Sequence, residues 1–338
     1  MDRPEYLGPS MTSSRPSAFA LTTPGRLRLY NTAELLRLPP PHWLVEGILT
    51  AGGLVGLYGP PETGKSFLAI DLALCVSSGL PWHGHSVKQG FAIYIAAEGG
   101  MGISKRVRTW LSTHKVSASV AQVGWLIEGI PINSTSEDMD VLFRRIDEEV
   151  QERPVLVVVD TLARCMESGG DENQQKDMGH FIAGIDRLRQ EYKATVLIVH
   201  HTNKGTLDQE RGSTAFRGAA DTMCLTELNR DGSITLSCNK QKDSERFEDK
   251  IFQLKIIPQF DSCVVVDEEH SCSQTILQAL AVGPLSFTEL RDRLKELGSG
   301  PPPTTFKRHL VGLRKKGLII KENEVYELAE VHLKIGGP

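Results

Sequence analysis

Apolar residues along the chain fall into two patterns that follow each other in turn, which predicts alternating strands and helices. Continuous apolar runs of strand length occur at 54–58 (LVGLY), 91–96 (FAIYIA), 155–159 (VLVVV) and 195–199 (TVLIV). Apolar residues at helical spacing occur at 67–79, 136–152 and 176–192. This order predicts an α/β fold with a mostly parallel sheet. Ser134 or Ser136 is the expected N-cap of the second helix.

The pattern changes from Asp221 onward. The segments DTMCLTEL, SITLSCNK, FQLKII and CVVVDE predict strands linked by short polar turns, without helices between them. We expect these strands to extend the sheet in an antiparallel manner.

A third pattern begins at Ser273 and predicts three helices followed by a hairpin. The first helix ends at Gly283, and Ser286 with Glu289 forms a capping box that opens the second. Thr304 or Thr305 is the expected cap of a third helix that runs to Lys316, and the hairpin turns near Asn323. This outline predicts a C-terminal winged-helix domain.

The predicted organisation therefore has three parts. Residues 1–26 are rich in Pro, Ser and Thr and are expected to form a disordered leader. Residues 27–270 are expected to form the α/β domain, and residues 271–338 the winged-helix domain.

Composition is that of an ordinary globular protein, with 338 residues, 40% apolar residues and a net charge of −4. The six cysteines include no CxxC pair, which favours reduced thiols in a cytoplasmic protein. No apolar run approaches the ~18 residues that a membrane helix requires, so we expect no membrane contact. The first residues do not resemble a signal peptide.

One motif carries the strongest chemical signal. Residues 59–66, GPPETGKS, match GxxxxGK[ST], and they lie between a predicted strand and a predicted helix, as a P-loop requires. Backbone N–H groups and the helix N-terminus bind phosphates in such loops, so ATP and Mg²⁺ are the expected cofactors. Lys65 is expected at the β- and γ-phosphates and Ser66 at Mg²⁺. The predicted nucleotide contacts are Gly59, Pro60, Pro61, Glu62, Thr63, Gly64, Lys65, Ser66 and Phe67.

A carboxylate beside a triphosphate is unfavourable, so Glu62 is expected to face solvent or a neighbouring subunit.

Three further polar residues follow predicted strands. Asp160 ends VLVVVD and is a candidate Walker B carboxylate that holds Mg²⁺ together with Ser66. Glu98 follows the second strand and is a candidate base that orients the attacking water. His201 is the candidate γ-phosphate sensor, and one histidine of the His200–His201 pair is expected to pack against the sheet. The alternatives are a turn aspartate and a surface glutamate. Metal binding by the two histidines is not expected, because no third His or Cys ligand is nearby in the sequence.

Several motifs, in order, resemble one family of ATPases. LYGPPETGKSFLAIDLA, YIAAEGG, VVVDTLAR, GGDEN and LIVHHTNK are similar to the RepA-type hexameric replicative helicases, relatives of DnaB with a RecA-like core. The lead-in LLRLPPPHWLVEGILTAGGLVGLYG also resembles AAA-type ATPases of phages and mobile elements. The resemblance covers residues 31–260. It implies a hexameric ring with ATP hydrolysis between subunits, and assigns Lys65, Glu98, Asp160 and His201 the roles given above.

The resemblance also implies where DNA binds. The segment 211–221, RGSTAFRGAAD, resembles the part of these proteins that meets single-stranded DNA in the ring channel. Lys204, Arg211 and Arg217 would contact backbone phosphates there. The alternative is an ordinary solvated loop.

Such rings complete the active site with a basic residue from the neighbouring subunit. DnaB-like proteins use a K-x-R pair, whereas SITLSCNKQKD offers Lys240 and Lys242 at that spacing. Lysine cannot bind phosphate bidentately, so either Lys242 acts in trans or Arg217 takes the role.

The C-terminal segment has its own charge pattern. Between Thr304 and Lys321 there is no acidic residue. The candidate DNA contacts there are Lys307, Arg308, Arg314, Lys315 and Lys316. A basic third helix in a winged-helix outline predicts contact with duplex DNA, and the alternative is a protein-binding module.

Two main functions remain open at the level of sequence. The first is an ATP-dependent, ring-forming DNA motor, a replicative helicase of a mobile element. The second is a nucleotide-switched DNA-binding regulator that does not unwind DNA. A filament-forming recombination ATPase is a third reading.

Overall fold

The computed structural model describes residues 29–40, 42–98, 100–133, 135–150, 152–166, 169–201, 214–297, 303–315 and 317–329. The chain divides into two units, Met1–Pro41 and His42–Pro338. In the first unit, α1 (Thr32–Leu35) begins with a capping box between Asn31 and Glu34. The expected disordered leader lies outside the described residues.

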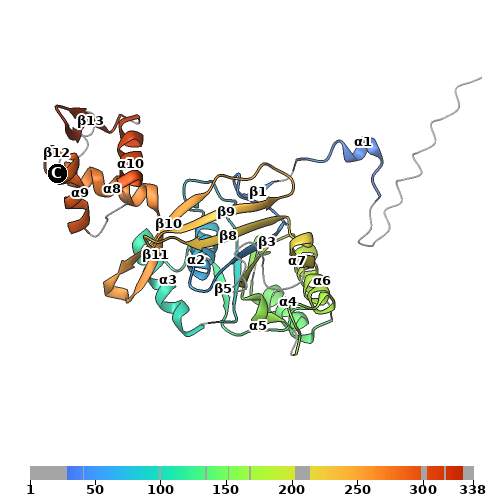
Figure 1. Cartoon of the computed structure of the whole chain (residues 1–338). Coiled ribbons are helices and arrows are strands. Elements are labelled where there is room, and N and C mark those ends of the chain that lie inside the picture. Colours follow the sequence, from blue (N-terminus) through green and yellow to red (C-terminus); the bar gives the residue numbers. More distant parts are fainter. Residues whose placement is uncertain are drawn as a thin grey trace, which may run out of the picture. The chain divides into compact units, whose positions relative to one another are not determined.

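A nine-stranded sheet forms the centre of the second unit (Figure 1). Its strands are β3 (Leu54–Gly59), β4 (Ala92–Ala96), β5 (Val123–Leu126), β6 (Leu156–Asp160), β7 (Thr195–His201), β8 (Thr222–Leu228), β9 (Ile234–Gln241), β10 (Lys250–Ile257) and β11 (Ser262–Asp267). They lie in the order β11-β10-β9-β8-β3-β7-β6-β4-β5. A separate hairpin, β1 (Trp43–Val45) and β2 (Leu49–Thr50), precedes the sheet.

Strands β8, β3, β7, β6, β4 and β5 are parallel, and β9, β10 and β11 continue the sheet in antiparallel fashion. This confirms the predicted α/β core with a parallel sheet and an antiparallel extension. One detail of the prediction is wrong. The segment DTMCLTEL forms β8, which pairs in parallel with β3. The parallel direction follows because α7 (Thr214–Ala219) precedes β8 and lets the chain cross back to the start of the sheet.

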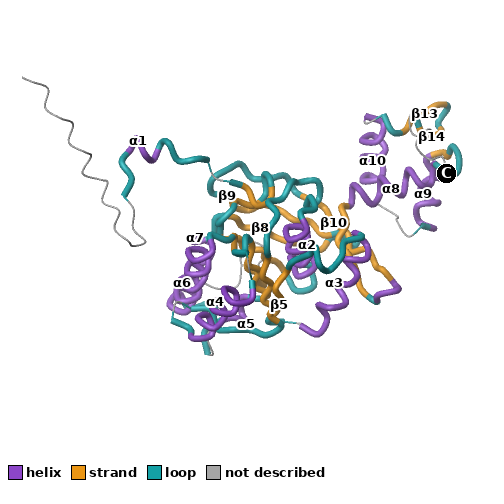
Figure 2. Tube along the Cα trace, turned by 180° about the vertical axis from the view of Figure 1, so that it is seen from behind, coloured by secondary structure: helices purple, strands orange, loops and turns teal. Residues whose placement is uncertain are grey.

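Helices cover both faces of the sheet, and each face has its own apolar cluster (Figure 2). One cluster contains residues of α2 (Lys65–Ser78) and α3 (Gly100–His114). The other contains residues of α4 (Glu137–Glu149), α5 (Leu162–Cys165), α6 (Gln175–Tyr192) and α7. A 3₁₀ turn, η1 (Pro258–Phe260), joins β10 to β11. Ser136 caps α4, and Ser134 lies outside the described residues.

Helix α2 begins and ends at glycines in the left-handed conformation. Gly64 at its start has φ 77° and Gly79 at its end has φ 74°. Glycine adopts these angles with the least strain, and Gly64 starts the helix inside the GPPETGKS motif, so that Lys65 and Ser66 form its first turn.

The C-terminal segment forms its own apolar cluster. Its elements are α8 (Glu268–Leu280), β12 (Leu285–Ser286), α9 (Phe287–Glu296), α10 (Pro303–Lys315), β13 (Ile319–Glu322) and β14 (Val325–Leu328). The strands form an antiparallel sheet of order β12-β14-β13. The Ser286–Glu289 capping box and the hairpin turn at Asn323 are confirmed. The predicted third-helix cap is wrong, because α10 begins at Pro303, where its fixed φ suits the first helical turn.

Among the residues that the structure describes, no helix has the length and apolar character needed to cross a bilayer.

Candidate functional site

The phosphate-binding motif follows β3, a strand whose residues are all buried. Lys65 lies at the start of α2 and is only 4% exposed. Its Nζ donates to the carbonyl oxygens of Gly59 (2.9 Å) and Pro60 (2.5 Å), and to Thr63 Oγ1 (3.3 Å). Burial lowers the pKa of Lys65 to about 8, against the opposing effect of Asp160 and Glu98. The loop therefore holds a desolvated cation that a phosphate can pair with.

Close contacts with β8 and β9 set the shape of the loop. Thr63 Oγ1 lies 2.7 Å from Thr226 Oγ1 on β8. A Cβ on Gly59 would lie 2.3 Å from the Thr226 carbonyl oxygen, and one on Gly64 would lie 2.3 Å from Ile234 Cδ1. At Gly59 the close atoms belong to backbone, so no larger residue fits there; at Gly64 the positive φ of 77° favours glycine, and a Cβ would displace the end of the Ile234 side chain. Glu62, by contrast, is exposed, as expected.

Strand register gathers the other candidate residues around the loop. Asp160 of β6 lies beside Ala96 of β4 on one side and Val199 of β7 on the other. His201, the last residue of β7, lies beside Gly59 of β3. The predicted set of Lys65, Glu98, Asp160 and His201 thus meets at the carboxyl end of adjacent parallel strands.

Asp160 is buried and has two unequal carboxylate oxygens. Tyr94 donates to Oδ2 over 2.7 Å, whereas Oδ1 has no hydrogen-bond partner in the described part of the chain. Burial raises the pKa of Asp160, while the hydroxyls of Tyr94 and Ser66 oppose this. A buried carboxylate oxygen without a donor, near a serine hydroxyl, fits a divalent cation such as Mg²⁺.

Glu98 stands at the edge of this group with its side chain 50% exposed. Thr161 Oγ1 donates to Glu98 Oε2 over 3.3 Å, and His201 Nε2 lies 3.8 Å from the same oxygen. Burial lowers the pKa of His201, and Lys65 acts in the same direction. His201 is therefore a neutral imidazole near neutral pH that can bind a phosphate oxygen or a water.

His200 is the buried histidine of the pair. His200 is 1% exposed, and its ring packs edge-on against Phe216 with 6.2 Å between ring centroids.

Two residues of this neighbourhood were missed by the sequence analysis. Tyr94 lies within the apolar run of β4, and its position beneath Asp160 depends on strand register. Arg106 of α3 places its guanidinium 4.4 Å from the ring centroid of Phe67 and lowers the pKa of Asp160. No motif marks Arg106, because α3 itself was not predicted.

The candidate trans residues lie at the opposite end of the sheet. Lys242 follows β9, whose last residue pairs with the first residue of β8, at the amino end of β3. Lys242 Nζ lies 3.4 Å from Asp221 Oδ1. Lys240 Nζ donates to the carbonyl oxygens of Arg217 (2.7 Å) and Gly218 (3.1 Å). None of these residues lies at its own chain's P-loop.

The candidate DNA contacts are only partly described. Lys204, Arg211 and Lys316 lie outside the described residues, as does the Arg308 side chain. Arg217 lies half-buried on α7. Lys307, Arg314 and Lys315 are exposed on α10.

Comparisons with known proteins agree with this geometry at the level of the family. Residues 25–206, more than half of the chain, match the family described as AAA domain. The chain belongs to the AAA domain family. A P-loop in an AAA domain indicates nucleotide binding. Among solved structures, the crystal structure of the RadB recombinase is 14% identical, covers 64% of this chain and 92% of its own, and has a TM-score of 0.46. A search of curated proteins found no match.

Proposed function

We propose that this AAA domain protein is an ATP-driven, ring-forming motor on DNA, a replicative helicase of a mobile element. The observation that carries the proposal is the meeting of Lys65, Glu98, Asp160 and His201 at the carboxyl ends of β3, β4, β6 and β7. A cation, a half-exposed base, a buried carboxylate and a neutral imidazole are the groups that hydrolysis of a phosphoanhydride requires.

Each residue has one task in this scheme. Lys65 and the loop amides bind the phosphates and neutralise the charge that develops during attack. Ser66 and Asp160 hold Mg²⁺, which supplies further charge neutralisation when bound. Glu98 orients a water and accepts its proton, because its carboxylate is half-exposed and is positioned by a hydrogen bond from Thr161. His201 lies between this base and the loop, where it senses the terminal phosphate.

The residues proposed to act across the subunit interface and on DNA extend the proposal to a ring. Lys242, or Arg217, reaches the active site of the neighbouring subunit, and its distance from its own P-loop supports action in trans. Lys204, Arg211 and Arg217 hold single-stranded DNA in the channel, and ATP hydrolysis changes that grip.

A second function is favoured by the C-terminal segment. Three helices and a β12-β14-β13 sheet follow the order expected of a winged helix, and exposed Lys307, Arg314 and Lys315 lie on its third helix. This supports a nucleotide-switched regulator that binds duplex DNA without unwinding it.

Two measurements test the proposal. Glu98→Gln is expected to keep ATP binding and lose about 10²–10⁴-fold in turnover, because only the proton acceptor is removed. Normal hydrolysis by this variant would show that another group is the base. Wild-type turnover is expected to rise strongly with single-stranded DNA. Two results together would identify the regulator instead. ATP turnover would not change when single-stranded DNA is added, and the Lys65→Ala variant would still bind duplex DNA.

A further inference from the structure

The P-loop contacts a buried threonine of β8. Thr226 is fully buried, and strand register places it directly after Leu225, the partner of Tyr58 in β3. Its Oγ1 lies 2.7 Å from Thr63 Oγ1 and 3.3 Å from the Tyr58 carbonyl oxygen. A Cβ on Gly59 would lie 2.3 Å from the Thr226 carbonyl oxygen and 2.4 Å from its Oγ1. Thr226 therefore borders the loop both at its first residue and at Thr63.

Thr63 connects this contact to Lys65, the cation that is proposed to bind phosphate. Thr63 is 3% exposed, and its Oγ1 accepts a hydrogen bond from Lys65 Nζ over 3.3 Å. The ammonium also donates to the carbonyl oxygens of Gly59 (2.9 Å) and Pro60 (2.5 Å). A lysine has three N–H donors, so the loop itself uses all of them. A phosphate that binds Lys65 therefore takes the place of at least one of these bonds, and the others must keep the amine in position.

The hydroxyl of Thr63 has a complete set of partners. It lies 2.9 Å from the Pro60 carbonyl oxygen, to which it can donate its one proton. Its two lone pairs then accept from Lys65 and Thr226. The 2.7 Å contact is shorter than the 3.3 Å contact with Tyr58, which favours donation from Thr226 to Thr63. Removal of the Thr226 hydroxyl would leave a buried lone pair of Thr63 without its donor, at the residue that also holds Lys65.

We propose that Thr226 is a positioning residue of the P-loop, which acts through the hydroxyl of Thr63 to hold the loop and Lys65 ready for phosphate. The inference rests on the proposed function, because it requires that the loop binds ATP. Strand β8 suits this task, since residues 222–226 are buried and the strand pairs with β3 on one side and β9 on the other. A loop held in its binding shape loses less conformational entropy when the ligand arrives, so Thr226 contributes to ATP affinity.

Calorimetry of the full-length protein with a slowly hydrolysed ATP analogue and Mg²⁺ tests this role. Thr226→Val replaces the hydroxyl with a methyl group of similar size and is expected to weaken analogue binding about tenfold, as the loss of one buried hydrogen bond does. Thr226→Ser keeps the hydroxyl and is expected to bind as wild type does. In steady-state turnover, Thr226→Val should raise KM with little change in kcat, because the bond is present in both the ground state and the transition state.

Thr195→Val is the matched control. Thr195 is also a fully buried threonine, but it lies at the start of β7, where its Oγ1 donates to the Thr50 carbonyl oxygen and accepts from the Gly52 N–H. This variant loses two hydrogen bonds, so it is expected to lower the midpoint of thermal unfolding at least as much as Thr226→Val and to leave analogue affinity unchanged. A loss of affinity that is equal in the two variants would overturn the positioning role, because it would follow from stability alone.

A double-mutant cycle tests whether Thr226 acts through Thr63. Thr63→Val is expected to weaken analogue binding, and the double variant of Thr63→Val with Thr226→Val should bind no more weakly than Thr63→Val alone. Two effects that multiply would overturn the proposal, because Thr226 would then act by another route. Equal affinity of Thr226→Val and wild type would also overturn it. If wild type binds no adenine nucleotide, the proposed ATPase function is wrong, and this role falls with it.

Discussion

Lys65 stays cationic at neutral pH although 96% of its surface is removed from water, and its contribution to the free energy of unfolding therefore depends on pH. Burial lowers its pKa from 10.5 to about 8, so the unfolded chain binds more protons than the folded one between these values. Stability from this group therefore rises as pH increases through that window. Relative to Lys65→Met, nucleotide-free wild type is expected to gain roughly 3 kcal/mol between pH 7 and pH 10.5.

Urea unfolding of both proteins at several pH values measures this difference. Lys88→Met, which changes an exposed lysine, is the matched control and should follow wild type at every pH. A constant difference between wild type and Lys65→Met across the range would show that the Lys65 amine is not desolvated.

Tyr94 is expected to tune the pKa of Asp160, the carboxylate that we propose as a ligand of Mg²⁺. Tyr94→Phe removes the 2.7 Å hydrogen bond to Asp160 Oδ2, which raises the pKa of Asp160 and moves the acid limb of kcat/KM to higher pH. The loss of a buried donor costs about 1–3 kcal/mol in stability. Tyr58→Phe, which loses a 2.7 Å bond from Asn239, should lower stability without moving the acid limb. If the acid limb of the kcat/KM profile of Tyr94→Phe coincides with that of wild type, the Tyr94 hydroxyl does not influence the ionisation of Asp160.

The motifs in the sequence predicted the positions of Lys65, Ser66 and Asp160. Lys65 and Ser66 follow the buried strand β3, Asp160 ends the buried strand β6, and adjacent parallel strands bring their carboxyl ends together. Tyr94 and Arg106 were missed because their roles depend on register and on helix packing. An apolar run that contains a tyrosine does not reveal which neighbour its hydroxyl will meet.

At the scale of elements, helix α6 contains one glycine that is tightly packed and one that has open space around it. A Cβ on Gly184 would lie 2.7 Å from the backbone of Asn133, whereas one on Gly179 would meet nothing within 4 Å. Gly184→Ala is expected to destabilise the protein by about 1–3 kcal/mol, because the helix must move away from that backbone. Gly179→Ala should stabilise it by about 0.5–1 kcal/mol through helix propensity. Equal effects on the free energy of unfolding would contradict this packing.

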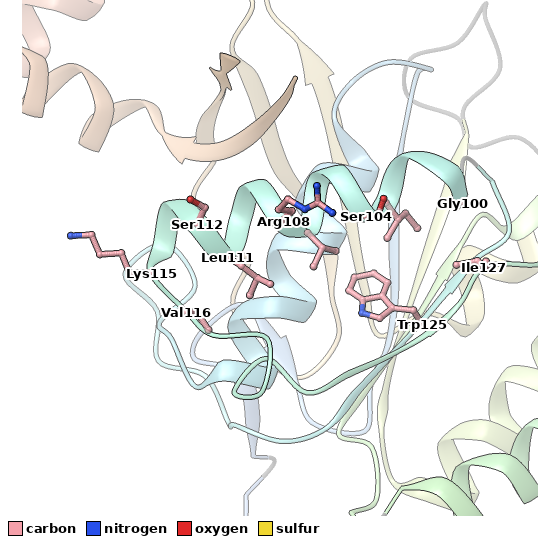
Figure 3. Close-up of a pocket in the computed structure, with 11 residues that line it drawn as sticks. Gly100, Ser104, Arg108, Leu111, Ser112, Lys115, Val116, Trp125 and Ile127 are labelled. Atoms are coloured by element: carbon pink, nitrogen blue, oxygen red, sulfur yellow. The ribbon is translucent and has the colours of Figure 1, made fainter. Parts of the chain in front are cut away.

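Two elements of the central domain, β5 and α3, were not predicted from the sequence. The strands β3, β6 and β7 are almost wholly buried, and their continuous apolar runs were recognised. The edge strand β5 has four half-buried residues and includes Gly124, so its sequence carries little strand signal. Helix α3 begins with the sequence Gly-Met-Gly, and because glycine has a low helix propensity, its start carries little helix signal. Residues of both elements line a cavity of about 1020 Å³ (Figure 3), so the sequence did not predict this cavity.

At the scale of the whole molecule, the P-loop and Lys242 lie at opposite ends of one sheet, which requires a second subunit if both serve one reaction. Mixing Lys65→Ala with Lys242→Ala is therefore expected to restore turnover that neither variant has alone. Random mixing joins an intact P-loop to an intact Lys242 at about one interface in four, so turnover should approach a quarter of wild type.

The matched control for this experiment pairs two lesions that lie on the same side of the interface. Lys65→Ala and Glu98→Gln both disable the P-loop side, so their mixture should stay inactive at every ratio. If Lys242→Ala turns over ATP normally by itself, while Arg217→Ala complements Lys65→Ala, the trans residue is Arg217. Because complementation depends on which face of the subunit each residue occupies, the result also locates the surface through which subunits meet.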